Sequence, residues 1–147
     1  MQLTQVLSKD CTHSISDCQS KKRALEIISE LAATQLGISE KEIFDSLFGR
    51  EKLGSTGIGQ GIAIPHGRIE DSYPPTAIFI RCEHPISFDS IDKQPVDLIF
   101  ALLVPGDENK QYLKILAAVA EKLHNKQICK SLRQADSDDD IYQIITT

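Results

Sequence analysis

Two segments in the first third of the chain show the apolar spacing of amphipathic helices. Between Ser20 and Gly37, apolar side chains recur at three- and four-residue intervals, with Ser20 suited to the N-cap and Gly37 to the residue after the last turn. Ser39-Glu40-Lys41-Glu42 then has the form of a capping box and predicts a second helix, which we expect to end at Gly49. Both helices have an apolar face that can pack on a core.

The middle of the chain changes to short apolar runs that are typical of strands. Residues 76–82 predict a strand, which we expect His84-Pro85 to end. Residues 96–104 are almost continuously apolar, as in a central strand buried on both faces, and this run stops at Pro105-Gly106. Residues 1–19 have a weaker pattern, which predicts one helical turn within residues 3–7 and a strand over residues 11–16.

The last third is predicted to be helical. We expect Asp107 to cap a long helix over residues 108–124, whose buried stripe comprises Tyr112, Ile115, Leu116, Val119 and Leu123. The acidic run at residues 136–140 fits the first turn of a final helix capped by Ser137, because carboxylates suit the helix dipole there; we do not interpret it as a metal site. The whole pattern predicts the α/β class, a single domain over residues 1–147 with a mixed β-sheet flanked by α-helices.

Composition narrows the functional classes. Hydrophobic residues make up 41% and charged residues 25%, which is typical of a soluble globular domain. A net charge of −5 argues against general nucleic-acid or anionic-membrane binding. Without a long apolar segment or a signal peptide, we expect a cytoplasmic chain with no direct membrane insertion. The four cysteines have no metal-binding spacing, so we expect reduced thiols, no metal and no cofactor.

Glycine is concentrated before one histidine. Five of the eight glycines fall within residues 54–68, at positions 54, 57, 59, 61 and 67. Pro65 holds itself and Ile64 in extended geometry, so we expect His66 to leave a short strand on a stiffened turn. Gly67 follows and has no side chain that would block the imidazole.

A histidine in this setting has a chemical use. Neutral imidazole is a nucleophile near pH 7 and can accept a phosphoryl group, whose oxygens need positive charge or N–H dipoles around them. Arg50 or Arg68 could supply a guanidinium, and Gly67 and Arg68 could supply backbone amides. From spacing alone, a glycine-rich turn beside a structural histidine is an equally good interpretation.

Other interpretations of the motifs are weaker. The chain has no Gly-x-x-x-x-Gly-Lys-Ser/Thr string, no Gly-x-Gly-x-x-Gly after a strand and no Gly-x-Ser-x-Gly, which argues against nucleotide-binding and serine-hydrolase sites. Lys21-Lys22-Arg23 stands at a helix start, where the dipole disfavours positive charge. We interpret this basic cluster as a solvated first turn, with docking of an acidic partner as the alternative.

The residues around His66 resemble a known signature. Gly54-Ser55-Thr56-Gly57-Ile58-Gly59 and Gly61-Ile62-Ala63-Ile64-Pro65-His66-Gly67 are similar to the active-histidine region of enzyme IIA proteins of the bacterial phosphotransferase system. The resemblance is to the mannitol/fructose class and is closest to its nitrogen-regulatory branch. Further similar blocks follow in the same order over nearly the whole chain: residues 20–25, 50–52, 88–92, 94–98, 100–105 and 141–145.

The resemblance implies a role for each residue of the candidate site. His66 would carry the phosphoryl group, and Arg50 would lie beside it. We also name Ser55 and Thr56 as candidate supporting residues of the site. Tyr112 stands where mannitol-type members have a second histidine, so this chain has a hydroxyl there and no charge near pH 7. Packing of the Tyr112 ring on the apolar helix face is an equally good interpretation of that residue.

The resemblance also implies a function and partners. It implies a phosphotransferase-type phosphocarrier of the nitrogen-regulatory branch, loaded on His66 by an HPr-like carrier that draws on phosphoenolpyruvate. No fused IIB or membrane IIC segment is expected, which favours regulation over sugar uptake. The implied targets are regulatory proteins, with kinases and potassium-transport proteins as candidate classes. Two alternatives stay open: a non-catalytic interaction module of the same fold, and a sugar-uptake IIA component that passes phosphate to a separate IIB.

Overall fold

A mixed β-sheet forms the centre of the molecule. The computed structural model describes residues 2–106 and 109–147. The strands are β1 (Leu7–Ile15), β2 (Gly57–Gly59), β3 (Ile62–Ala63), β4 (His66–Ile69), β5 (Thr76–Ile86) and β6 (Val96–Pro105). Their order in the sheet is β1-β5-β6-β3-β2, with β4 also paired to β6. β5 runs antiparallel to β6, whereas β3 and β4 run parallel to it. The predicted fold class is therefore confirmed.

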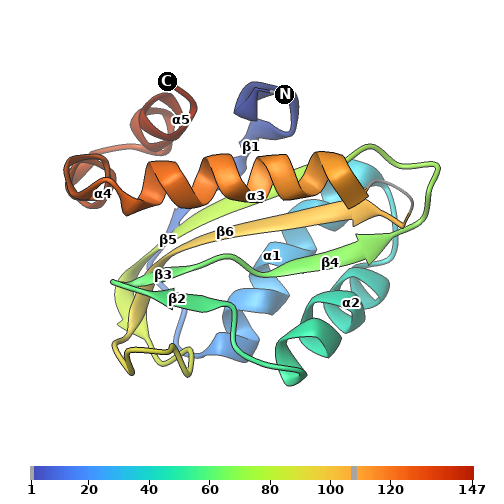
Figure 1. Cartoon of the computed structure of the whole chain (residues 1–147), viewed down its shortest axis with the longest axis horizontal. Coiled ribbons are helices and arrows are strands. Elements are labelled where there is room, and N and C mark those ends of the chain that lie inside the picture. Colours follow the sequence, from blue (N-terminus) through green and yellow to red (C-terminus); the bar gives the residue numbers. More distant parts are fainter. Residues whose placement is uncertain (1, 107–108) are drawn as a thin grey trace.

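Helices cover both faces of the sheet. They are α1 (Lys21–Leu36), α2 (Glu40–Lys52), α3 (Asn109–His124), α4 (Lys126–Gln134) and α5 (Asp138–Thr146), after a 3-10 turn at Leu3–Gln5. In Figure 1, α1 and α2 lie on one side of the sheet and α3 runs along the other, with α4 and α5 near the C-terminal end of α3. Because both faces are covered, β6 is buried along almost its whole length, as its apolar run predicted.

The sequence located the helix starts well. The side chains of Ser20, Ser39 and Ser137 each accept a hydrogen bond from a backbone N–H of the first turn, as N-caps do. Gly37 ends α1 with φ 72°, a left-handed conformation that glycine adopts without steric cost. The predicted cap at Asp107 lies outside the described residues. The predicted strand over residues 11–16 belongs to β1, which begins earlier, at Leu7.

Two predicted ends were wrong. The second helix does not stop at Gly49 but continues to Lys52, where Glu51 is buried through side-chain contacts with α1 and with the loop that follows. These contacts outweigh the helix penalty of glycine, about 1 kcal/mol. His84-Pro85 does not end the strand either. β5 continues to Ile86, and its pairing with β6 shifts register between Arg81 and Ile86, so that an irregular stretch accommodates Pro85.

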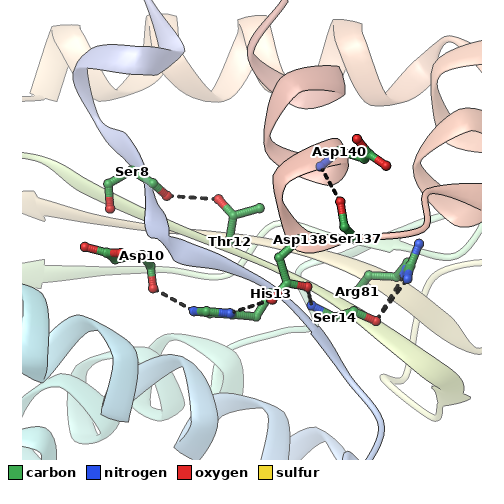
Figure 2. A network of polar contacts seen from close by, with 9 residues as sticks. All are labelled: Ser8, Asp10, Thr12, His13, Ser14, Arg81, Ser137, Asp138 and Asp140. Carbon is green, nitrogen blue, oxygen red and sulfur yellow. Dashed lines mark hydrogen bonds and ion pairs between the residues drawn. The ribbon is translucent and has the colours of Figure 1, made fainter.

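A polar network attaches the C-terminal helix to β1, as Figure 2 shows. His13 Nδ1 lies 3.0 Å from Asp138 Oδ2, and His13 Nε2 lies 2.7 Å from the carbonyl oxygen of Asp10. The Ser14 N–H donates to Asp138 Oδ1 at 2.9 Å. Arg81 donates to Ser14 Oγ at 3.1 Å and to carbonyl groups at the end of α4. Ser137 caps α5 and the aspartates at 138–140 lie in its first turn, as predicted, and Asp138 also binds the neighbouring strand.

Candidate functional site

The glycine-rich stretch folds into a short hairpin and then re-enters the sheet. The turn between β2 and β3 needs positive φ, which Gly59 adopts at 99° and Gly61 at 83°. β3 pairs with the first half of β6, and the chain then passes through Ile64-Pro65 and pairs again from His66 onward. His66 thus follows the short strand β3 and the Ile64-Pro65 link, as we expected, and is itself the first residue of β4, opposite Leu102.

The backbone before His66 orients its ring. His66 Nδ1 lies 3.4 Å from the carbonyl oxygen of Ile64, and the Ile64 N–H donates to the carbonyl of Thr56 at 3.0 Å. Because a carbonyl only accepts, this contact favours the hydrogen on Nδ1 and leaves the lone pair of the neutral ring on Nε2. Nε2 is therefore the nitrogen available for bond formation.

The environment keeps this ring neutral near pH 7. Burial lowers the pKa of His66, and the charge of Arg50 lowers it further. The Ile64 carbonyl and the charge of Glu51 act in the opposite direction, and the net effect is a pKa below the usual value. A neutral imidazole keeps the lone pair that a nucleophile needs.

One predicted site residue, Tyr112, lies close to His66, and another, Arg50, acts on it through its charge. Arg50, in the last turn of α2, donates through a guanidinium N–H to the carbonyl of Gly54 at 2.9 Å and remains partly exposed. The Tyr112 ring, near the start of α3, has its centroid 6.1 Å from that of His66, with the planes tilted by 32°. The structure therefore places a phenol beside the imidazole and a cation near enough for its charge to lower the imidazole pKa.

Gly67 and Arg68 have different surroundings. A Cβ atom on Gly67 would lie 2.5 Å from Ser46 Oγ, so this glycine lets α2 pack directly against β4. The pairing of His66 with Leu102 directs the Gly67 amide toward β6. Arg68 is exposed and, two residues along the strand, has its side chain on the same face as His66.

The side chains of Ser55 and Thr56 are occupied by hydrogen bonds within the chain. Ser55 Oγ donates to the carbonyl of Phe88 at 2.6 Å and accepts from the amide of Gly57 at 3.0 Å. The N–H and the hydroxyl of Thr56 donate to the two carboxylate oxygens of Glu51, at 2.8 and 2.6 Å. We did not predict a role for Glu51 from the sequence.

The basic cluster at the start of α1 is only partly solvated. Lys22 is exposed, as predicted. Lys21 instead lies with its Nζ 2.9 Å from Glu51 Oε1, and its side chain is only 19% exposed, so a solvated first turn was wrong for this residue. In the sequence, one signal indicated a partner for Lys21: a positive charge is unfavourable at the start of a helix, so a lysine there needs a stabilising contact elsewhere.

The other histidines are less suited to accept a phosphoryl group. Both ring nitrogens of His13 are engaged by Asp138 and Asp10, and His84 and His124 are exposed. Within residues 2–106 and 109–147, no three His, Cys, Asp or Glu side chains are grouped to hold a metal ion. In the same part of the chain, no helix has the length and apolar character needed to cross a bilayer.

Comparisons with known proteins identify the family of the chain. Residues 5–147 match the family model described as "Phosphoenolpyruvate-dependent sugar phosphotransferase system, EIIA 2". The nitrogen regulatory protein of Klebsiella oxytoca is 57% identical over 147 residues, covering 99% of this chain and 91% of that protein. The crystal structure of nitrogen regulatory protein IIA-Ntr from Neisseria meningitidis superposes with a TM-score of 0.92 at 39% identity, over 98% of this chain and 99% of that one.

A more distant structure shows the same fold. It is the complex of enzyme IIA and phosphorylated enzyme IIB for mannitol from Escherichia coli, with a TM-score of 0.76 at 16% identity, over 95% of this chain and 98% of that chain. Together with the sheet and the histidine at the start of β4, these matches define the class: the chain belongs to the EIIA type 2 family of the phosphoenolpyruvate-dependent phosphotransferase system. Within that family its similarity is to the nitrogen regulatory, IIA-Ntr branch.

Proposed function

We propose that the protein is a phosphohistidine carrier that accepts a phosphoryl group on Nε2 of His66 from an HPr-like carrier and regulates protein partners through its phosphorylation state. The observation that carries this proposal is the setting of His66. Its Nδ1 faces the Ile64 carbonyl, burial and the charge of Arg50 lower its pKa, and the Tyr112 ring lies beside it.

The proposed reaction is a direct transfer between two proteins. The lone pair of Nε2 forms a bond to phosphorus, while the bond from phosphorus to the donor atom of the carrier breaks and that atom keeps the electron pair. Positive charge develops on the imidazole, and the Ile64 carbonyl stabilises it by accepting from Nδ1–H.

The phosphoryl oxygens need cationic partners. Arg50 is the cation whose charge acts on His66, so we propose that it binds these oxygens, with the side chain or amide of Arg68 as a second donor. The Gly67 amide is a weaker candidate because it faces β6. Tyr112 can add one neutral hydrogen bond.

The surface beside the site suits a protein partner. Leu53 follows α2 directly and is 84% exposed, and Leu113 follows Tyr112 and is 57% exposed. Apolar side chains of this kind next to a reactive group are typical of protein contact surfaces. A phosphoryl group on His66 adds about −1.5 to −2 charges next to them, so we expect regulatory partners to distinguish the two forms.

The test is phosphorylation by a labelled, phosphorylated HPr-like carrier. We expect label that is labile in acid and stable in alkali on the unaltered protein and on His13→Ala, and none on folded His66→Ala. Label that persists in His66→Ala would refute the assignment. A protein without label, whose partners bind regardless of the carrier, would instead support the non-catalytic interaction module.

A second candidate function has one observation in its favour. The Escherichia coli mannitol IIA protein, which shares this fold, forms a complex with a phosphorylated IIB protein. Transfer of label from His66 to an added IIB domain would favour the sugar-uptake role, whereas retention of label in its presence would favour regulation.

A further inference from the structure

An ion pair joins α1 to α2, and its carboxylate binds the glycine-rich loop at Thr56. Lys21 Nζ is 2.9 Å from Glu51 Oε1, donates to the carbonyl of Phe88 at 3.2 Å and lies 4.7 Å from the centroid of the Phe88 ring. A cation gains nothing from the dipole at the start of α1, so these contacts account for its position.

Glu51 is the centre of this arrangement. Its side chain is 2% exposed, and its two carboxylate oxygens accept from Lys21 Nζ, from the Thr56 N–H and from the Thr56 hydroxyl. Buried ion pairs add little net stability compared with apolar residues of the same volume, but they require one geometry. The consequence here is that Thr56 is held by two bonds to a single carboxylate.

Thr56 in turn contacts the residue that orients the imidazole. The Thr56 carbonyl accepts from the Ile64 N–H at 3.0 Å, and the Ile64 carbonyl faces His66 Nδ1 at 3.4 Å. A continuous set of polar contacts therefore runs from Glu51 through Thr56 and Ile64 to His66. Lys21 anchors this set on a different helix.

We propose that Glu51, anchored by Lys21, is a positioning residue for His66: it fixes Thr56 and thereby the Ile64 peptide that holds Nδ1–H and directs Nε2 toward phosphorus. This inference rests on the proposed function. The charge of Glu51 has a second effect, because it raises the pKa of His66 and so opposes Arg50.

Three substitutions separate these effects. Glu51→Gln removes the charge and weakens the contacts, Thr56→Val removes the hydroxyl donor and keeps the charge, and Lys21→Met removes the anchor. Lys22→Met is the matched control for the lysine, since Lys22 is exposed. Thr12→Val is the matched control for the threonine, since Thr12 is buried in β1 and donates to the Ser8 carbonyl away from the site.

The readouts are kcat and KM for phosphoryl transfer from the HPr-like carrier, and the ¹⁵N chemical shifts of the His66 ring, which report its tautomer. We expect Glu51→Gln and Thr56→Val to lower kcat roughly ten- to hundredfold, the range for a small misplacement of reacting groups, with KM little changed. We also expect the Nδ1–H tautomer of His66 to be less populated. Thr56→Ser, which keeps both donors, should restore both values.

Wild-type kcat and tautomer in folded Glu51→Gln and Thr56→Val would overturn the proposal. If Glu51→Gln does not fold, Lys21→Gln with Glu51→Gln removes both charges while keeping polar contacts, and the same readouts apply. The tautomer is measured without phosphate. Absence of label on unaltered His66 would therefore refute the proposed function, while the ¹⁵N shifts would still decide whether Glu51 positions the ring.

Discussion

Replacing Arg50 by alanine tests the electrostatic part of the site most directly. Among the residues that the structure describes, the guanidinium makes one hydrogen bond, to the Gly54 carbonyl at 2.9 Å, and the side chain is partly exposed. Loss of one such bond changes the free energy of unfolding by about 0.5–1.5 kcal/mol, and exposure places this case near the lower end. We therefore expect only a small decrease in thermal stability.

The expected effect on phosphoryl transfer is larger. A charged hydrogen bond from a guanidinium to a phosphoryl oxygen contributes about 1.5–3 kcal/mol, which corresponds to roughly a ten- to hundredfold loss of rate. Removal of the positive charge also raises the pKa of His66, because Arg50 is one of the groups that lower it. The Arg50→Ala variant should therefore accept the phosphoryl group slowly, and its His66 should titrate at higher pH than in the unaltered protein.

The assay is the initial rate of label transfer from the HPr-like carrier, together with an NMR titration of His66. Arg68→Ala is the matched control, since Arg68 is an exposed arginine on the same strand as His66. A rate for Arg50→Ala within about twofold of the unaltered protein would refute the reasoning. A larger loss of rate in Arg68→Ala than in Arg50→Ala would refute it as well, because the cation that binds the phosphoryl oxygens would then lie on β4 and not on α2.

Three further predictions follow from individual contacts of the site. Tyr112→Phe should keep phosphoryl acceptance within roughly tenfold, since it removes at most one neutral hydrogen bond worth ~0.5–1.5 kcal/mol; collapse of transfer with an intact fold would show that the hydroxyl is essential, and Tyr112→His tests whether added charge matters. His66 should stay neutral as pH falls through the reference value of about 6.5, because burial lowers its pKa. As pH falls, the unfolded chain therefore takes up a proton on His66 before the native protein does. The free energy of unfolding should decrease between the unfolded and the native pKa of His66. An NMR titration midpoint at or above the reference value would contradict this. Gly67→Ala should destabilise the fold by about 1–3 kcal/mol in denaturant titration, because its Cβ would lie 2.5 Å from Ser46 Oγ, and an unchanged midpoint would show that α2 can move away.

The sequence by itself determined the features that depend on local chemistry. The caps at Ser20, Ser39 and Ser137 and the end of α1 at Gly37 were predicted because capping involves residues within one turn of each other. The apolar run of β6 required burial on both faces, whatever covered them. The glycine and proline residues around His66 indicated the candidate acceptor for the same reason, since backbone restriction acts on adjacent residues.

Tertiary structure decided how the candidate site is supported. Lys21 meets Glu51 across 30 residues of sequence, Tyr112 reaches His66 across 46, and no local pattern encodes such distances. Tertiary contacts also decided the end of α2. Local propensity predicted an end at Gly49, but the burial of Glu51 stabilises the helix through Lys52. The lowered pKa of His66 likewise depends on its burial in the folded chain. The local sequence therefore indicates which histidine is the candidate acceptor, whereas packing in the folded protein sets its reactivity, because burial and charge act through space and not along the sequence.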